Sequence, residues 1–226
     1  MKYIITTLGI LALLSCASET EKKVLDDIAE VYNGDVSYSK SFVSNESEKR
    51  TSFNVVIKNS AMIDTLAPTV TTSNTALLVY NALTEDEKDA YTDIEVNLIN
   101  SKKDTVSYYY GMDILAPINH KAKVFRDFSQ RIIDKDFDML DELKNNANIP
   151  KSMAVNIRNG IAAKEKKHGS VKGYYPFGIA EERDEIGKIY QFQSYLEFTD
   201  GYKLSYLLVV DATEGKDKII GYRFFD

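Results

Sequence analysis

The first half of the chain alternates between two spacings of apolar residues. Those between 24 and 33 recur at the spacing of one helix face, whereas those between 51 and 58 alternate with polar residues as in a strand. Helices are predicted at 24–33 and 74–83, and a further helical turn begins at the capping box Thr84-Glu85-Asp86-Glu87. Strands are predicted at 36–38, 51–58, 94–98 and 106–110, with turns at 45–48 and 101–104. This order predicts a curved antiparallel sheet with helices on one face.

The second half places helices before strands. A helix is predicted over 124–133, a second over 137–143, and a third from Pro150, whose missing N–H suits a first turn, to Gly169. Strands then follow at 171–179, 189–198, 202–210 and 219–225. We therefore expect an α+β chain with two domains, each a curved antiparallel sheet packed against helices.

The apolar face of the central hairpin in the second sheet predicts its register. A two-residue turn would place the apolar residues of the two strands on opposite faces. A three-residue turn over 199–201 keeps them together and pairs Phe198 with Tyr202. Gly201 would then take the left-handed position of the turn, where a side chain is unfavourable.

The start of the chain has a different pattern. Lys2 is followed by an apolar run from Tyr3 to Leu14, then by Ser15 and the only cysteine, Cys16. A basic start, a short apolar core and a small residue before the cleavage point are typical of a secretory signal peptide. The run is well short of the roughly 20 residues that a membrane-spanning helix needs.

The four residues Leu13-Leu14-Ser15-Cys16 resemble the lipobox of bacterial lipoproteins. The resemblance implies that residues 1–15 are removed and that Cys16 becomes the N-terminus, with a diacylglyceryl group on its thiol. Two or three acyl chains hold a protein stably on a membrane, whereas one does not. Ordinary cleavage after Ala17, which would release a secreted protein, is the alternative. Because Ala17 rather than Asp follows the cysteine, the resemblance favours the outer membrane, with the protein facing the periplasm or the cell surface.

The predicted division of the chain follows from these patterns. Residues 16–23 comprise the lipidated cysteine and a polar linker. The linker, residues 17–23, spans at most about 23 Å at ~3.3 Å per residue. We therefore expect the folded part to lie close to the membrane. We place an N-terminal α+β domain at 24–118 and a C-terminal domain at 119–226, with a connection at Pro117-Ile118-Asn119-His120.

Composition excludes several classes of function. The net charge of −6 disfavours binding to nucleic acid, whose phosphates repel an acidic surface. A hydrophobic content of 44% supports packed cores rather than disorder. Once Cys16 is acylated no thiol remains for a disulfide, a thiolate metal site or a cysteine nucleophile.

From about Ala122 to Asp226 the predicted order of three helices and four antiparallel strands resembles the nuclear transport factor 2-like fold, also called cystatin-like. The residues that carry the resemblance are Lys135-Asp136-Phe137-Asp138, Tyr195-Leu196-Glu197-Phe198-Thr199-Asp200-Gly201 and Lys218-Ile219-Ile220-Gly221-Tyr222-Arg223-Phe224. The resemblance implies a cone between helices and sheet that can hold an apolar ligand, and some members of that fold are enzymes. The first half resembles no family that we can name.

Candidate catalytic residues are few. His168 follows a lysine-rich helix end, where a cation favours the last carbonyls, and His120 lies in the predicted connection. Neither belongs to a His-x-x-x-His metal motif, and no phosphate loop or nucleophile elbow occurs in the sequence. We therefore expect no catalytic residue, no metal and no cofactor.

Tyrosine is the enriched reactive residue, with clusters at 108–110 and 174–175. Because tyrosine combines a large contact area with a polar tip, we consider a ligand or partner surface formed by Tyr174, Tyr175, Phe177, Tyr190, Phe192 and Tyr206. Ordinary packing in cores and strands is the competing explanation. Pro176 predicts an edge strand at 174–177, where a partner strand or a ligand can approach.

Three functions stay open at this point. The first is a non-enzymatic, membrane-anchored lipoprotein that binds a protein partner or a small apolar ligand at the cell envelope. The second is an isomerase or dehydratase that uses an open cone lined by Tyr190, Phe192 and Tyr206. The third is an inhibitor or immunity protein that blocks a secreted enzyme.

Overall fold

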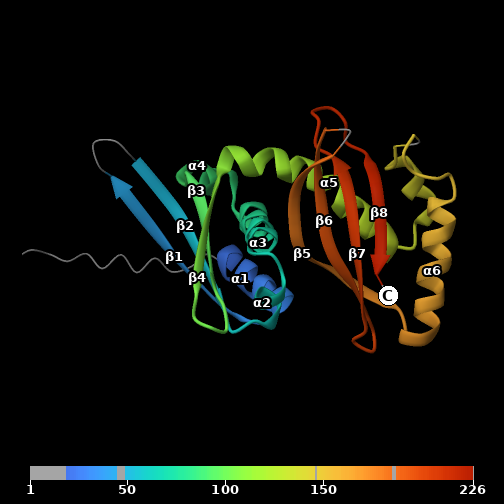
Figure 1. Cartoon of the computed structure of the whole chain (residues 1–226), viewed down its shortest axis with the longest axis horizontal. Coiled ribbons are helices and arrows are strands. Elements are labelled where there is room, and N and C mark those ends of the chain that lie inside the picture. The colour runs from blue at the N-terminus through green and yellow to red at the C-terminus, as the bar shows by residue number, and fades with distance from the viewer. Residues whose placement is uncertain (1–18, 45–48, 146, 185–186, 226) are drawn as a thin grey trace, which may run out of the picture.

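The computed structural model describes residues 19–44, 49–145, 147–184 and 187–225, and shows an α+β protein with two four-stranded sheets packed with helices (Figure 1). Cys16, the predicted signal peptide and the turn at 45–48 lie outside the described residues. The elements are α1 (Glu19–Tyr32), β1 (Asp35–Ser44), β2 (Lys49–Lys58), α2 (Ala61–Thr65), α3 (Pro68–Ala82), α4 (Glu85–Ala90), β3 (Asp93–Ile99), β4 (Thr105–Gly111), α5 (Met112–Ile133), the 3₁₀ helix η1 (Phe137–Glu142), α6 (Met153–His168), β5 (Val171–Asp184), β6 (Gly187–Phe198), β7 (Lys203–Asp211) and β8 (Ile219–Phe225).

The first sheet, sheet A, has the strand order β1-β2-β3-β4, and its two central strands run parallel. The prediction of a wholly antiparallel sheet is therefore wrong at this pair. Parallel neighbours need a long crossover, and residues 59–92 supply one that contains α2, α3 and α4. The capping box predicted at Thr84 is present, since its hydroxyl accepts from the backbone N–H of Glu87.

The second sheet, sheet B, is antiparallel throughout, with the order β5-β6-β7-β8. The predicted hairpin register is confirmed: Leu196 lies opposite Leu204, and the N–H of Phe198 donates to the carbonyl of Tyr202 at 2.9 Å. Gly201 has a φ of +87°, the left-handed conformation expected for the three-residue turn.

Several helices differ from prediction: α2 was not predicted, α3 begins at Pro68 rather than residue 74, and α5 begins at Met112 rather than residue 124. The linker predicted up to residue 23 is helical from Glu19, the helix predicted at 137–143 is the 3₁₀ helix η1, and the third helix begins at Met153 rather than Pro150. Apolar spacing identified these helices, but it does not distinguish 3₁₀ from α geometry or fix the first turn.

The connection predicted at 117–120 is also wrong, because these residues lie inside α5. This helix supplies Leu115 to the core of sheet A, and Ile118 and Phe125 to the core of sheet B. The boundary predicted between residues 118 and 119 therefore falls within a helix that packs in both cores.

Helices α1 and α3 lie between the two sheets, and α5 crosses from sheet A to sheet B (Figure 1). Ala76 and Val79 of α3 pack into the core of sheet A, whereas Leu77 packs into the core of sheet B. A helix that packs on both sides is apolar around much of its surface, which agrees with the apolar stretch seen in the sequence. No helix in the described part of the chain is long and apolar enough to cross a bilayer.

Candidate functional site

The edge of sheet B at β5 is covered by α3. β5 is an edge strand, as Pro176 predicts, but two side chains of α3 occupy its outer carbonyl groups. The Ser73 hydroxyl donates to the carbonyl of Ile179 at 2.6 Å, and Nδ2 of Asn74 donates to the carbonyl of Pro176 at 3.0 Å. The edge that the sequence offers to an external strand is thus used within the chain.

Tyr32, at the end of α1, also contacts this edge of sheet B. We call the contacts of Tyr32, Ser73 and Asn74 with β5 the seam. The buried hydroxyl of Tyr32 lies 2.9 Å from the carbonyl of Phe177, to which it donates, and it accepts from Nδ2 of Asn74 at 2.9 Å. Burial raises the pKa of this phenol, so the hydroxyl stays protonated as a donor. These two contacts, with those of Ser73 and Asn74, tie α1, α3 and β5 together.

Gly178 permits the close approach of β5 to α3. A β-carbon at this position would lie 2.5 Å from Cγ1 of Val70, and the register of β5 on β6 shifts between Pro176 and Gly178. The shift is a bulge, which bends a strand and redirects its side chains. Here it brings the edge of sheet B against the helix.

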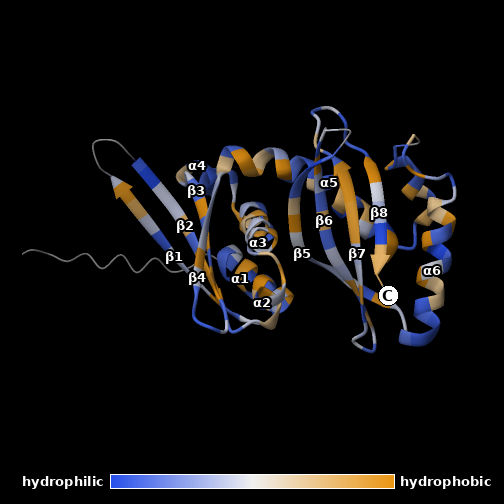
Figure 2. Cartoon of the chain, in the orientation of Figure 1, coloured by the Kyte–Doolittle hydropathy of each residue, from blue (hydrophilic) through white to orange (hydrophobic). Residues whose placement is uncertain are grey.

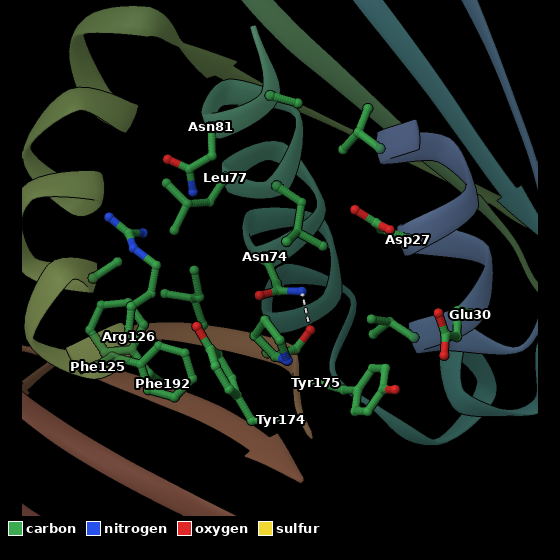
Figure 3. Close-up of a pocket in the computed structure, with 18 of the residues that line it drawn as sticks. Asp27, Glu30, Asn74, Leu77, Asn81, Phe125, Arg126, Tyr174, Tyr175 and Phe192 are labelled. Atoms are coloured by element: carbon green, nitrogen blue, oxygen red, sulfur yellow. Dashed lines mark hydrogen bonds between the residues drawn. The ribbon is translucent and has the colours of Figure 1, made fainter. Parts of the chain in front are cut away.

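Beside this seam, α1, α3, α5 and β5 enclose a cleft of about 500 Å³ (Figure 3). That volume lies within the range of small-molecule sites, which is roughly 300–1,000 Å³. Most of its walls are apolar, and the aliphatic and aromatic residues that line it are Val24, Val31, Leu77, Leu78, Ala82, Ala122, Phe125, Tyr174, Tyr175, Pro176, Ile179 and Phe192.

One wall of the cleft carries a cation. Arg126 of α5 is half-buried beside Phe125 and Tyr174, and its Nη2 donates to Oδ1 of Asn119 at 3.0 Å. Burial lowers the pKa of Arg126 and raises the pKa of the Tyr174 phenol, which the nearby guanidinium partly offsets. Both shifts indicate a site from which much of the water is excluded.

The opposite wall carries carboxylates. Asp27 and Glu30 project from α1 on the side of the cleft away from Arg126 (Figure 3). Lys23 of the same helix forms an exposed ion pair with Asp27 at 2.7 Å. Burial, followed by the charge of Glu30, raises the pKa of the Tyr175 phenol. The α5 side of the cleft thus carries a guanidinium, whereas the α1 side carries Glu30 and the ion pair of Asp27 with Lys23, which also lines the cleft.

The structure divides the six aromatic residues of the predicted surface. Tyr174, Tyr175 and Phe192 line the cleft, and Phe177 packs against the core of sheet A. Tyr190 and Tyr206 are buried, with 4% and 1% of their surfaces exposed. The polar residues of the cleft were missed from the sequence, namely Thr20, Lys23, Asp27, Glu30, Asn74, Asn81 and Arg126.

Between α5 and sheet B, side chains fill the space that the resemblance implies as a cone. Phe125 stacks on Phe192 with ring centroids 5.3 Å apart, and Phe128 lies 6.1 Å from Tyr206. The hydroxyl of Tyr206 is 2.6 Å from the hydroxyl of Ser129, and burial raises the pKa of this phenol. The concave face of sheet B is thus a packed core at these residues.

Both histidines lie outside the lining of the cleft. His168 contacts Asp200 at 2.9 Å and stacks on Tyr202, which supports its assignment to a helix end. His120 contacts Asp217 at 2.9 Å. Among the residues whose positions are described, no three His, Cys, Asp or Glu side chains gather in a way that could hold a metal ion.

Comparison of the chain with protein-family models, with curated proteins and with solved structures finds no match. The functional argument therefore rests on the chemistry of the cleft. Its apolar walls suit a hydrophobic body, and its guanidinium suits one acidic group.

Proposed function

We propose that this chain is a non-enzymatic, lipid-anchored binding protein of the cell envelope. Its ligand is a small, mainly apolar molecule with one acidic group, and its binding site is the cleft between α1, α3, α5 and β5. The observation that carries the proposal is the half-buried Arg126 in an otherwise apolar wall.

The position of Arg126 favours an anionic ligand. Removing a charge from water is costly unless a partner compensates it, and the hydrogen bonds of this guanidinium go to Asn119, a neutral residue. A carboxylate or phosphate entering the cleft would supply a charge-assisted partner with the geometry that arginine prefers. The aromatic rings of Phe125 and Tyr174 would cover the apolar part of the ligand next to it.

The acidic wall favours one orientation of the ligand. Glu30 repels an anion on the α1 side, where Asp27 is paired with Lys23, whereas Arg126 attracts it on the α5 side. The apolar body would then lie between Leu77 and Leu78 of α3 and the rings of β5. Repulsion from one wall adds to specificity because it penalises the reversed pose.

The remaining parts of the proposal come from the sequence. Cys16 would carry the diacylglyceryl anchor, with the protein on the outer membrane and facing the periplasm or the surface. The C-terminal half, from about residue 122, would be a diverged nuclear transport factor 2-like or cystatin-like fold, supported by its helices followed by four antiparallel strands. In this arrangement the ligand lies beside the filled cone rather than inside it.

Native mass spectrometry of the protein extracted from its own membrane tests the proposal. We expect a small-molecule adduct on the wild-type protein and on Lys123→Gln, which removes an exposed charge from the same helix. Arg126→Gln should lose the adduct. Loss from both variants, or a protein adduct with no small molecule, would contradict the assignment of this cleft.

A further inference from the structure

Strands β1, β4, β5 and β8 form the edges of the two sheets, and all but β4 carry features that disfavour pairing with another chain. Strand β5 is covered by α3 and contains Pro176. Strand β8 is paired at its beginning, where the N–H of Ile219 donates to the carbonyl of Leu143 at 2.8 Å. Strand β1 carries Asp35 and Lys40, and charged side chains on an edge oppose the addition of a further strand.

The remaining edge, β4 of sheet A, lacks these features. Its sequence over 105–111 is Thr-Val-Ser-Tyr-Tyr-Tyr-Gly, with no charged residue and no proline. Figure 2 shows β4 mostly in pale colours, whereas the turn before it is deep blue. Among the residues that the structure describes, the backbone of β4 pairs with β3 alone. Its other side thus presents a row of N–H and C=O groups on which a further strand can form.

The two faces of β4 also expose uncharged side chains. Val106 is 37% exposed and Tyr109 is 49% exposed. The hydroxyl of Tyr110 lies 2.7 Å from that of Thr72 in α3, so Tyr110 and Val106, which share a face of the strand, lie on the helix side of sheet A. Tyr109 lies on the other face, where its hydroxyl donates to Oε1 of Glu95 at 3.0 Å. A strand added at this edge would therefore meet uncharged side chains of β4 on both faces.

The sequence of β4 suits an antiparallel copy of itself. Pairing centred on Tyr108 uses the whole strand, and it places Val106 opposite Tyr110 of the second copy and Ser107 opposite Tyr109. Both of these pairs join a smaller side chain to a tyrosine, and residues directly opposite each other on one face are the pairs that stabilise a sheet. No like charges meet within this pairing.

Charges beyond the ends of β4 are complementary in the same arrangement. Lys103 lies in the turn before the strand, Asp113 follows the strand, and both are exposed. With Tyr108 at the centre, Lys103 of each copy comes opposite Asp113 of the other. Parallel pairing in the same register would instead bring Lys103 next to Lys103. Complementary charges therefore favour the antiparallel copy and help to fix its register.

We infer that two copies of this protein join through antiparallel pairing of their β4 strands, so that their A sheets form one continuous sheet. This inference goes beyond the proposed function, because the described lining of the cleft contains no residue of β4. The pairing requires neither a ligand in the cleft nor an acyl group on Cys16.

Disulfide cross-linking tests the pairing and its register in the membranes of cells that make the full chain. In the Tyr108→Cys protein the two thiols would face each other, with Cα atoms about 4.5–5.5 Å apart, which permits a disulfide. In the matched control Ser107→Cys, the same residue of the two copies would be about 8 Å apart, which is too far. The unchanged protein controls for cross-linking through Cys16.

After oxidation, electrophoresis without reductant measures the fraction of disulfide-linked dimer. We expect at least about fivefold more dimer from Tyr108→Cys than from Ser107→Cys or the unchanged protein, because only the first places two thiols within reach. Monomer alone would overturn the inference. Equal dimer from the two variants, more dimer from Ser107→Cys, or a mixed disulfide with a different protein in place of the dimer would also overturn it.

Charge reversal supplies a second measurement at exposed positions, where folding should be unaffected. In the Tyr108→Cys protein, Lys103→Glu should lower the yield of dimer by about threefold or more, because it places two negative charges together. Adding Asp113→Lys should restore the yield. Equal yields from all three proteins would contradict pairing across this edge. The ligand adduct should persist in every variant, so loss of the dimer alone leaves the proposed function intact.

Discussion

The concave face of sheet B under α5 and the cleft beside β5 are both lined by aromatic residues, yet the first is filled at Phe128 and Tyr206 and the second is hollow. In the first, Phe128 and Tyr206 fill the space between α5 and the sheet. In the second, Tyr174 and Tyr175 line walls that stay apart. The difference arises from what covers each surface: a helix packed flat on a sheet closes it, whereas α1, α3 and α5 meet the edge strand at different angles (Figure 1). Aromatic composition alone therefore does not identify a binding site.

The largest expected effect concerns the filled face. Phe128→Ala removes a fully buried ring and should lower the free energy of unfolding by about 3–5 kcal/mol, through lost transfer energy and the cavity that remains. Phe225→Ala, at an exposed position, should change it by less than about 0.5 kcal/mol. Chemical denaturation measures both. A small loss for Phe128→Ala would mean that the concave face is not packed as described.

The next effect concerns the seam. Tyr32→Phe removes the hydroxyl that donates to the carbonyl of Phe177 and leaves the Asn74 amide only its bond to Pro176, and should cost about 1–3 kcal/mol of unfolding free energy. Because the seam joins β5 to α1 and α3, the variant should also increase amide hydrogen exchange in β5. Exchange confined to α1 would show that β5 is held in another way.

Substitution of Arg126 in the cleft should change stability less than substitution of a core residue. Arg126→Met removes a charge from a half-buried position but keeps an apolar chain of similar length, so the free energy of unfolding without ligand should stay within about 1 kcal/mol of wild type. Adduct formation should be lost. The two measurements together distinguish a ligand-binding arginine from a structural one, which would lower stability.

The smallest expected effect is a pH dependence at Asp217, which lies outside the lining of the cleft. The hydrogen bond from Lys121, followed by that from His120, lowers the pKa of Asp217 below its ordinary value. A carboxyl with a lowered folded pKa contributes stability that is complete above its unfolded pKa of about 3.9 and is lost as the pH falls through the folded pKa. The melting temperature of wild type should therefore fall more between pH 5 and pH 3 than that of Asp217→Asn. Parallel curves for the two proteins would refute the assignment, and the adduct should be unchanged in the variant.

Patterns that are local in the sequence predicted local structure well. The even-numbered apolar residues of β6 and β7 set the hairpin register, because a wrong turn would have moved half of them to the other face. Pro176 indicated an edge strand, because it cannot donate a hydrogen bond to a neighbour. Each of these predictions depends on residues that are close together in the chain.

The candidate site depends on contacts between distant segments, which local sequence patterns do not predict. Alternation of apolar residues predicts a strand but not the direction of its neighbour, so the parallel pair of β2 and β3 was missed. Arg126 resembled any charged residue on a helix, and Asn74 resembled a polar residue at a helix start. A polar pair within the otherwise apolar helix α3, Ser73 and Asn74, was the signal for the covered edge of β5.

The most direct test of the central claim is a crystal structure of the protein purified with its native ligand retained. We expect electron density for a small molecule between α1, α3, α5 and β5, with an acidic group within hydrogen-bond distance of the Arg126 guanidinium and the apolar part between Leu77 and Tyr174. An empty cleft together with a ligand bound elsewhere, or a ligand whose polar group faces Asp27 and Glu30, would contradict the account.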